Sequence, residues 1–356
     1  MPDPAQPIRV AVLGAGQMGL VVTSMLLGAR GSSNGASGGS GASPQVRLWT
    51  HDADEAGRLA QTRQSPRLPG FQLDPRVRIA LTDADALAGA DVVVCAVPCQ
   101  FIREAFVRLK AHVPPRVGIV SVAKGIETET LLRPTQTIAD VLADDPDAPA
   151  RPYAVLSGPT IAAELARCLP ATMIAASDDA SFAERVQHLF GTSWLRIYTS
   201  PDTLGVELAG ATKNVIALAS GVLDGLNAGC NAKSALLARG LAEIARLGAA
   251  MGSSPETFFG IAGAGDLATT CFSPEGRNRT CGEALGRGVT LDQYLATATS
   301  VVEGVDTTRA VSDLAKRYKV EMPITAAVYE VLFKKVDPLE AIGRLMGREL
   351  KAERIG

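Results

Sequence analysis

Short apolar segments alternate with segments of helical periodicity over the first 200 residues. The strand-like segments are 9–13, 46–49, 77–79, 91–97, 117–122, 153–156, 172–176 and 195–198. Several of them, such as 92–97, are continuously apolar, as strands are when helices cover both faces of their sheet. This alternation predicts an α/β fold with a parallel, doubly wound sheet.

After residue 200 the strand-like segments stop. Apolar residues instead recur at helical spacing over 204–223, 233–251, 278–286, 303–318 and 324–334. Ser200, Pro201 and Asp202 provide a break followed by a helix start. We therefore expect a sheet domain over 1–200 and an all-helical domain over 201–356. Because ligands bind beyond the carboxyl ends of parallel strands, the cleft is expected between the two.

Two stretches of the first domain have other interpretations. Residues 28–43 form a Gly/Ser tract where a short connection would suffice, and we interpret it as a flexible surface insertion without chemistry. Residues 10–29 carry no charge, which is also typical of a membrane span or signal peptide. Four glycines and several polar residues make this stretch a poor apolar segment, so we expect no membrane span.

Composition narrows the possible partners. The 356 residues are 47% hydrophobic, and 35 Lys and Arg balance 37 Asp and Glu, which disfavours a nucleic-acid partner. The six cysteines, at 95, 99, 168, 230, 271 and 281, are widely spaced, so we expect reduced, buried thiols in a cytoplasmic protein. The three histidines do not fall at ligand spacing, and no metal site is expected.

A glycine pattern follows the first strand. Gly14 permits a tight turn, Gly16 lets the backbone approach a pyrophosphate, and Gly19 lets the next helix pack closely. The amino end of that helix favours phosphate charge. The pattern predicts a dinucleotide site, with a glycine-rich turn that binds no nucleotide as the alternative. A second copy, at 263–265, lacks a preceding strand and is expected to be a loop.

Four stretches carry polar groups at strand ends or within apolar helices: 121–127 with Lys124, 157–160, 210–217 with Lys213, and 265–279. Each has an ordinary explanation. Lys124 could extend along a strand end, Thr160 could cap a helix, and Asp266 could cap a helix with Arg277 as ion partner. Lys213 is the exception, because burial of an unpaired ammonium is costly. Desolvation also lowers a lysine pKa, as a proton donor near neutrality requires.

Nine motifs occur in a familiar order. They are GAGQMG at 14–19, SVAKGIE at 121–127, SGPT at 157–160, GVELAGATKNVIALASGVLDGL at 205–226, RGLAEIARLG at 239–248, GAGDL at 263–267, RNR at 277–279, VVEGV at 301–305 and MPIT at 322–325. Over residues 8 to 346 the chain resembles bacterial-type NAD(P)-dependent sn-glycerol-3-phosphate dehydrogenases. The resemblance implies a Rossmann-type sheet and reversible reduction of dihydroxyacetone phosphate with NAD(P)H, which supplies glycerophospholipid synthesis. It also implies a cytoplasmic enzyme and a possible homodimer.

The resemblance also implies roles for individual residues. Lys213 matches the proton-transferring lysine, and Asp266 is expected to orient Lys213 or the substrate hydroxyl. Arg277 is the expected phosphate partner, because a guanidinium can form two charge-assisted hydrogen bonds. The substrate-binding positions are Lys124, Gly158, Thr160, Lys213, Asp266, Gly276, Arg277 and Asn278. The cofactor-binding positions are Gly14, Gly16, Gln17, Met18, Gly19, His51, Lys124, Ala162, Arg277, Val301 and Glu303.

The sequence departs from the family pattern in places. Gln17 and Met18 stand where relatives commonly have a small residue and an aromatic one. Gly276 stands where relatives commonly have a small hydroxyl residue, so a phosphate contact at Gly276 would use the backbone. His51 and Asp52 follow the second strand. A carboxylate at this place favours the ribose hydroxyl of NAD, whereas a cation favours the 2′-phosphate of NADP. The two residues favour opposite choices, so NAD and NADP are not ranked. A hydroxy-acid dehydrogenase of the same architecture and a non-enzymatic dinucleotide sensor remain alternatives.

Overall fold

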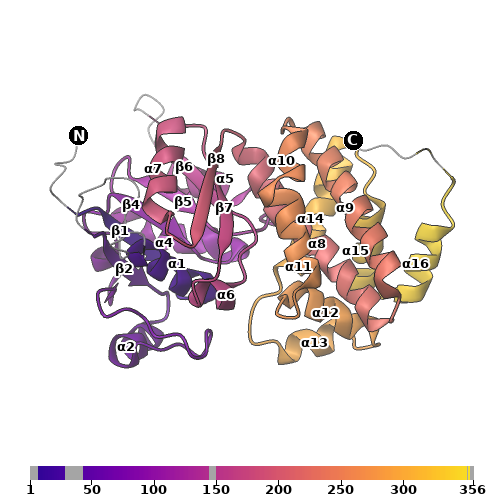
Figure 1. The fold of residues 1–356 in the computed structure, drawn as a ribbon, viewed down its shortest axis with the longest axis horizontal. Coiled ribbons are helices and arrows are strands. Elements are labelled where there is room, and N and C mark those ends of the chain that lie inside the picture. The colour runs from indigo at the N-terminus through magenta and orange to yellow at the C-terminus, as the bar shows by residue number, and fades with distance from the viewer. Residues whose placement is uncertain (1–6, 29–42, 144–149, 351, 353–356) are drawn as a thin grey trace.

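The computed structural model describes residues 7–28, 43–143, 150–350 and 352. Its first part is an eight-stranded sheet in the order β3-β2-β1-β4-β5-β6-β7-β8 (Figure 1). The strands are β1 (Arg9–Leu13), β2 (Gln45–Trp49), β3 (Arg78–Ile79), β4 (Val92–Cys95), β5 (Gly118–Ser121), β6 (Tyr153–Ser157), β7 (Ala171–Ala176) and β8 (Leu195–Ser200). The α/β prediction is confirmed, and the Gly/Ser tract lies outside the described residues except at its ends.

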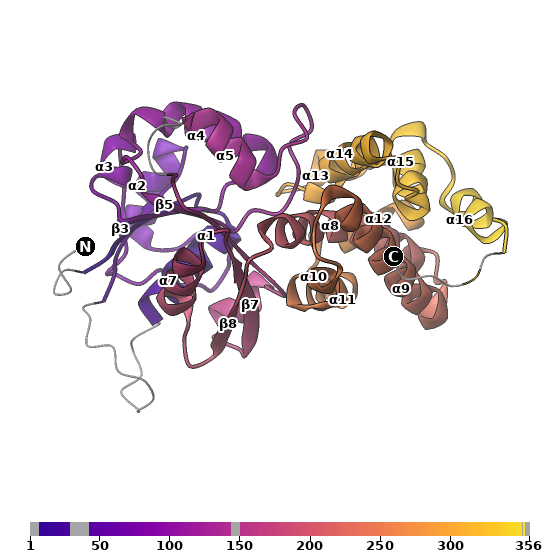
Figure 2. The same cartoon turned by 90° about the horizontal axis from the view of Figure 1, so that it is seen from above.

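Helices cover both faces of this sheet (Figure 2). They are α1 (Gln17–Gly28), α2 (Ala53–Thr62), α3 (Asp83–Leu87), α4 (Ile102–Leu109), α5 (Pro134–Leu142), α6 (Ala162–Ala166) and α7 (Ala180–Phe190), with short turns at Cys99–Phe101 and Lys110–His112. Leu20 of α1 and Phe182 of α7 belong to the core on one face, and Phe106 of α4 and Ile138 of α5 to the core on the other. Burial on both faces explains why these strands are continuously apolar.

The strand order places a crevice at the centre of the sheet. From β1 the chain proceeds to β2 and β3 on one side, and it then returns to β4 and β5 on the other. Val10 of β1 is in register with Val46 of β2 and with Val92 of β4, all in parallel. Connections that leave on opposite faces open a space at the carboxyl ends of β1 and β4, where dinucleotides bind in such sheets.

The sheet is not parallel throughout, which corrects the prediction. β7 runs antiparallel to β6, with Leu156 opposite Ala175, while β8 is parallel to β7. The connection from β6 to β7 contains only the five-residue helix α6. A parallel crossover needs a helix long enough to pack back across the sheet, whereas a short connection reverses the chain. As a result, β7 begins beside the carboxyl end of β6.

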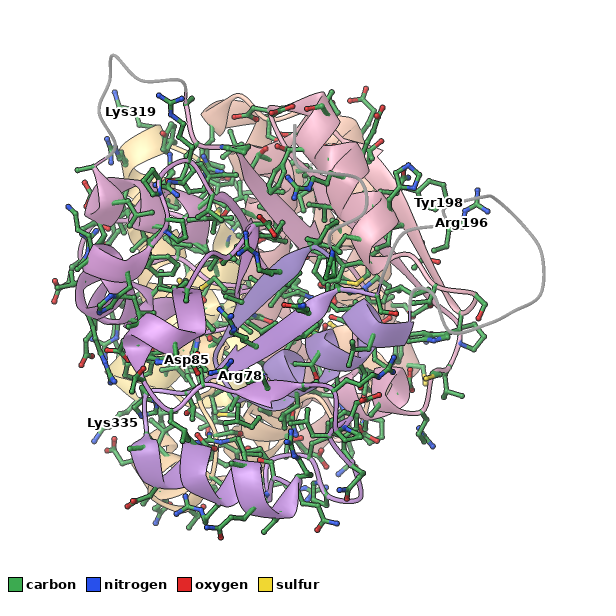
Figure 3. All side chains as sticks on the ribbon, turned by 90° about the vertical axis from the view of Figure 1, so that its left-hand side faces the viewer. Arg78, Asp85, Arg196, Tyr198, Lys319 and Lys335 are labelled. Atoms are coloured by element: carbon green, nitrogen blue, oxygen red, sulfur yellow. The ribbon has the colours of Figure 1, made fainter. Side chains whose placement is uncertain are left out.

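Charged side chains occupy both edges of the sheet (Figure 3). Arg78 on β3 pairs with Asp85 at 2.8 Å. On β8 the guanidinium of Arg196 lies 5.0 Å from the ring centroid of Tyr198. Charges on edge strands disfavour pairing with a strand of another molecule.

The second part of the chain is helical, as predicted. Its helices are α8 (Thr203–Gly225), α9 (Gly229–Met251), α10 (Pro255–Phe259), α11 (Asp266–Phe272), α12 (Arg277–Gly286), α13 (Leu291–Thr297), α14 (Glu303–Tyr318), α15 (Pro323–Lys334) and α16 (Pro338–Met346). Asp202 caps α8 by accepting a hydrogen bond from Gly205 N at 2.8 Å, which confirms the predicted helix start. Among these helices the periodicity did not predict α10, α11, α13 and α16, which are short or peripheral.

Helix α8 lies at the centre of this helical region. It is long and apolar enough to cross a membrane by composition, but 83% of its most apolar window is buried inside the protein. It packs closely on α12, because a Cβ on Gly282 would lie only 2.0 Å from the carbonyl oxygen of Leu218. Burial on nearly all sides explains why α8 is apolar around its whole circumference.

Two local predictions are wrong. Residues Ile261–Gly265 form a helical turn rather than a loop, and Gly265 N donates to Gly260 O five residues earlier at 3.2 Å. The turn requires glycine, since a Cβ on Gly263 would lie 1.9 Å from Phe258 O. Of the six free cysteines, Cys168 and Cys230 are exposed rather than buried.

Candidate active site

Two lysines and one aspartate meet where the sheet faces the helical region. Lys124 follows β5, Lys213 lies on α8, and Asp266 begins α11. One carboxylate oxygen of Asp266 accepts a hydrogen bond from Lys213 Nζ at 2.6 Å, and the other accepts one from Lys124 Nζ at 2.6 Å. The structure thus brings together three predicted site residues from sequence positions far apart.

Two more predicted positions contact Lys124. Its ammonium donates to the carbonyl oxygen of Gly158 at 2.9 Å and to Thr160 Oγ1 at 3.3 Å. Gly158 has a φ of +145°, and a Cβ there would lie 2.9 Å from the carbonyl oxygen of Thr172 on β7. Glycine is therefore required at this strand end, because the antiparallel strand β7 passes close to it.

Burial governs the chemistry of Lys213. The residue is 6% exposed, and desolvation lowers its pKa to about 8. Asp266 opposes this shift by stabilising the ammonium, whereas the charge of Lys124 adds to it. A lysine with a pKa near 8 can both donate and accept a proton close to neutral pH.

The cluster carries more positive than negative charge. Two ammonium groups share the single carboxylate of Asp266, whose side chain is 2% exposed. Lys213 also forms a hydrogen bond with Thr270 Oγ1. A buried site with one excess positive charge favours an anionic ligand or a transition state that develops negative charge.

These contacts exclude two ordinary explanations. Asp266 pairs with the two lysines and not with Arg277. Thr160 does not cap α6, because the helix begins after Ile161 and the Thr160 hydroxyl donates to Gly158 O at 3.1 Å. Both side chains therefore point into the cluster instead of completing a helix end.

A second group of predicted residues lies beside the amino ends of α12 and α14. Arg277 Nη1 donates to the carbonyl oxygen of Val301 at 3.2 Å, and Asn278 Oδ1 accepts a hydrogen bond from Gly304 N at 2.9 Å. Gly276 precedes them as the N-cap residue of α12. These contacts hold the segment before α14 against the start of α12.

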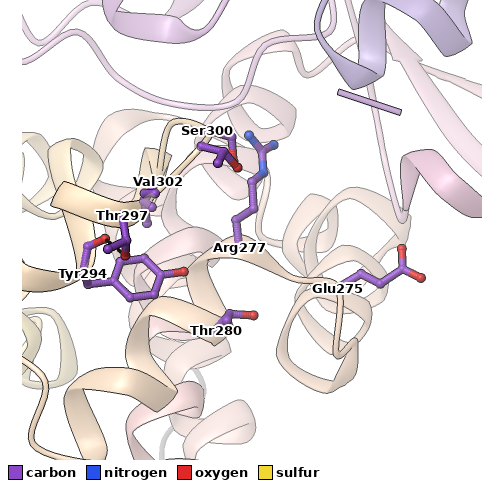
Figure 4. A pocket seen from close by; sticks show the side chains of 9 residues that line it. Glu275, Arg277, Thr280, Tyr294, Thr297, Ser300 and Val302 are labelled. Carbon is purple, nitrogen blue, oxygen red and sulfur yellow. Dashed lines mark hydrogen bonds between the residues drawn. The ribbon is translucent and has the colours of Figure 1, made fainter. Parts of the chain in front are cut away.

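Arg277 also lines a cavity of about 280 Å³ (Figure 4). Its guanidinium points toward the loop that carries Ser300, whereas Glu275 points away from it. Three residues with hydroxyl groups, Thr280, Tyr294 and Ser300, line the same cavity. Among the residues that the structure describes, the guanidinium has one protein acceptor, the Val301 carbonyl, so most of its donors are available to an anion.

Glu303 connects the helical region with the sheet. Its Oε1 accepts a hydrogen bond from Cys99 N at 3.2 Å, while Oε2 is buried and has no hydrogen-bond partner in the part of the chain that the structure describes. Burial raises the pKa of this carboxyl to about 7, and the charge of Arg277 opposes the shift. A buried acceptor without a partner is costly, so Oε2 is available to a donor on a ligand.

The glycine turn after β1 has the geometry that a dinucleotide needs. Gly14 has a φ of +110°, and a Cβ there would lie 2.7 Å from Ala96 O. A Cβ on Gly19 would lie 1.8 Å from Gly14 O. Apart from the two chain neighbours of Gly16, no described residue places a heavy atom within 4 Å of the Cβ position of Gly16. Close packing thus requires the outer glycines, and the space beside Gly16 is open to a pyrophosphate.

The other predicted cofactor positions surround the same edge of the sheet without joining the lysine cluster. Gln17 donates to Arg67 O at 2.8 Å, Met18 packs on the sheet core, and Ala162 begins α6. His51 is exposed. Asp52 caps α2 by accepting hydrogen bonds from Asp54 N at 2.8 Å and Glu55 N at 3.1 Å. These contacts leave NAD and NADP unranked.

Two residues that contact or adjoin the site were missed. Cys99 acts through its backbone N–H, which sequence patterns do not reveal. Glu207 is a buried carboxylate on α8, less than two turns before Lys213. Its signal was present, since it is a charged residue within the apolar stretch 205–226.

Comparison with known proteins shows the family of this chain. Residues 9–183 match the family model for the N-terminus of NAD-dependent glycerol-3-phosphate dehydrogenase, and residues 202–343 match the model for its C-terminus. A glycerol-3-phosphate dehydrogenase [NAD(P)+] from Oleidesulfovibrio alaskensis is 40% identical over 97% of this chain and 100% of its own length. A glycerol-3-phosphate dehydrogenase [NAD(P)+] from Thermobifida fusca is 42% identical over 98% of this chain and 99% of its own length.

A solved structure gives the same result. The crystal structure of glycerol-3-phosphate dehydrogenase from Coxiella burnetii has a TM-score of 0.86 and 31% identity, and the match covers 96% of this chain and 99% of that one. The resemblance and the fold class predicted from the sequence are confirmed. The chain belongs to the NAD(P)-dependent glycerol-3-phosphate dehydrogenase family.

Proposed function

We propose that this protein reversibly reduces dihydroxyacetone phosphate to sn-glycerol 3-phosphate with NADH or NADPH, and so supplies glycerophospholipid synthesis. The observation that carries the proposal is the buried cluster in which Lys124 and Lys213 share the carboxylate of Asp266. It lies at the edge of the sheet where ligands bind, and its excess positive charge suits a phosphorylated ketone.

Lys213 acts as the catalytic acid in this proposal. NAD(P)H, when bound, supplies the hydride. The Lys213 ammonium donates a proton to the ketone oxygen and stabilises the negative charge that develops there. Because its pKa is about 8, the protonated form needed for reduction is lost as pH rises through 8. Oxidation of glycerol 3-phosphate needs the neutral amine and is favoured above that pH.

The remaining site residues bind and orient. Lys124, Thr160 and Asp266 position the carbon that reacts, with the backbone of Gly158 at the same strand end. Arg277 binds the phosphate, and Asn278 and the backbone of Gly276 fill further positions around it. Both Arg277 and Lys124 would also contact the cofactor, as the family resemblance implies.

The cofactor positions divide between the sheet and the helical region. The turn of Gly14, Gly16 and Gly19 would hold the pyrophosphate. Across the interface, the unpartnered Oε2 of Glu303 would accept a hydrogen bond from the cofactor. The other proposed contacts are Gln17, Met18, His51, Ala162 and Val301. The 1–200 and 201–356 domain division, the cytoplasmic location and a homodimer stay predictions.

Oxidation of NADH or NADPH, followed by absorbance, tests the function. We expect oxidation that depends on dihydroxyacetone phosphate with at least one of the two cofactors. Pyruvate, a keto acid without phosphate, is the matched control and is expected to give none. Oxidation with pyruvate but not with the phosphorylated ketone would indicate a hydroxy-acid dehydrogenase. Cofactor binding without any turnover would indicate a dinucleotide sensor.

Replacement of Arg277 by alanine tests the phosphate site. We expect a rise of about a hundredfold in the KM for dihydroxyacetone phosphate, since a charge-assisted bidentate contact is lost, with a smaller change in kcat. Arg287→Ala is the matched control, because Arg287 is an exposed arginine at the other end of α12 that pairs with Glu283. Equal KM values for the two variants would contradict the assignment.

A further inference from the structure

A long loop connects β5 with α5. Residues 122–133 contain no helix or strand, although most of them are buried or half-buried. Buried loops of this length are uncommon, because their backbone groups need partners away from water. We call residues 122–133 the strap.

The strap enters the helical region. Ile126 is 0% exposed and belongs to the hydrophobic core formed by α8, α9, α14 and α15, and Leu131 packs against the same core. The strap also carries Lys124, which pairs with Asp266 of α11. The strap therefore joins the sheet to the helical region through side-chain contacts. The chain itself passes from the sheet to the helical region between β8 and α8.

Side chains of the sheet region hold the middle of the strap. Gln100 Nε2 donates to Ile126 O at 2.8 Å, and Gln100 Oε1 accepts a hydrogen bond from Thr128 N at 3.1 Å. Arg103 donates to both carboxylate oxygens of Glu127, at 2.9 and 2.8 Å. These contacts fix the shape of the loop, but they do not connect it to α8.

Glu207 makes that connection at the far end of the strap. Its carboxylate is buried on α8 and forms an ion pair with Arg133, the last residue of the strap. It also accepts hydrogen bonds from Thr135 N at 2.9 Å and Thr135 Oγ1 at 2.8 Å, at the amino end of α5. Glu207 and Lys213 lie on the same helix, so this contact and the catalytic lysine share one rigid support.

We propose that Glu207 is a positioning residue, which by fixing the strap to α8 sets the place of Lys124 relative to Lys213 and Asp266. The proposal rests on the function proposed above. Lys124 is anchored at one end of the strap and Glu207 at the other. If the far end is released, the strap keeps only the contacts of its middle and near end. Lys124 is then held less firmly and can shift relative to Lys213, and small displacements in a catalytic site have large effects on rate.

The test compares Glu207→Gln with Glu243→Gln. Glu243 is the matched control, because it is also a buried carboxylate that receives helix N–H groups, those of Ile324 at 2.9 Å and Thr325 at 2.8 Å. It lies on α9 in the helical region, and these hydrogen bonds join it to α15 and not to the strap. Thr135→Val is a milder second variant, since it removes only the hydroxyl donor and keeps the shape of the side chain.

Two measurements are made on each full-length variant. Hydrogen exchange followed by mass spectrometry reports on the strap without any need for activity, and we expect faster exchange over 122–133 in Glu207→Gln but not in Glu243→Gln. Steady-state kinetics should show a KM for dihydroxyacetone phosphate raised about tenfold in the same variant. Thr135→Val should raise the exchange rate over 122–133 and the KM for dihydroxyacetone phosphate, each by less than Glu207→Gln does.

The pH profile separates positioning from a general loss of stability. The groups that face Lys213 are Asp266, Lys124, Cys271 and the hydroxyl of Thr270. Because the charge of Lys124 lowers the pKa of Lys213, its displacement should move the alkaline limb of kcat/KM to higher pH in Glu207→Gln. Glu243→Gln should leave that limb where it is in the parent protein.

Unchanged KM and pH profile in Glu207→Gln would overturn the proposal, whatever the exchange rates. Equal changes in Glu207→Gln and Glu243→Gln would also overturn it, because they would indicate a general effect of destabilisation. A parent protein without activity on dihydroxyacetone phosphate would refute the proposed function instead, and the exchange measurement would still report whether Glu207 holds the strap.

Discussion

Lys213→Ala is expected to reduce kcat for reduction of dihydroxyacetone phosphate at least about a thousandfold, because it removes both proton transfer and stabilisation of the developing alkoxide. Binding of NADH and NADPH should be retained, since Lys213 is not among the proposed cofactor contacts. Steady-state kinetics give the first quantity, and titration of cofactor fluorescence gives the second. A variant with kcat within tenfold of the parent would refute the catalytic role of Lys213.

Lys233→Ala is the matched control for this variant. Lys233 is also a buried lysine, and its Nζ lies 2.8 and 2.9 Å from the carboxylate oxygens of Asp224. It lies on α9, outside the proposed site. Loss of this lysine is expected to lower the stability of the fold while kcat stays within a fewfold of the parent value.

Asp266→Asn should have the second largest effect. Asp266 raises the pKa of Lys213, so its replacement by a neutral amide should lower that pKa below 8 and leave much of Lys213 deprotonated at neutral pH. The amide nitrogen would also face an ammonium with no acceptor between them. We expect kcat/KM for reduction at pH 7.5 to fall at least about a hundredfold. The pH profile should show its alkaline limb at lower pH.

Asp224→Asn provides the comparison. Asp224 also lies between two cations, Lys233 at 2.8 Å and Arg279 at 3.3 Å, but outside the proposed site. Its replacement should leave the alkaline limb in place. If Asp266→Asn likewise leaves that limb in place, Asp266 does not control the protonation of Lys213.

The sequence predicted most of the fold, because the hydrophobic pattern records burial. Strands such as 92–97 are apolar throughout, and the long helices of the second part show clear periodicity. The reversed direction of β7 was not predicted, since it depends on how far the short helix α6 can reach and not on the apolar pattern of the strand. The helical turn at 261–265 was not predicted, because glycines usually indicate a loop, whereas here close packing against Phe258 requires glycine at position 263.

The candidate site was predictable where a charge interrupts an apolar segment. Lys213 stands out in α8, and Lys124 stands out after β5. The contacts that join the two regions were not predictable, because they link residues that are far apart along the chain. Glu303 lies 204 residues from Cys99, and Glu207 lies 72 residues from Thr135. No local sequence pattern indicates such a pair. In the first pair the hydrogen-bond donor is the backbone N–H of Cys99, which every residue other than proline has.

The position of Ile126 has a consequence for the modularity of the protein. This residue follows β5 of the sheet, yet it belongs to the hydrophobic core of the helical region. A chimera that combined the helical half with the nucleotide-binding half of an unrelated dehydrogenase would leave a hole in that core. The two halves are therefore not interchangeable building blocks, and substitutions on either side of the strap are constrained by the other.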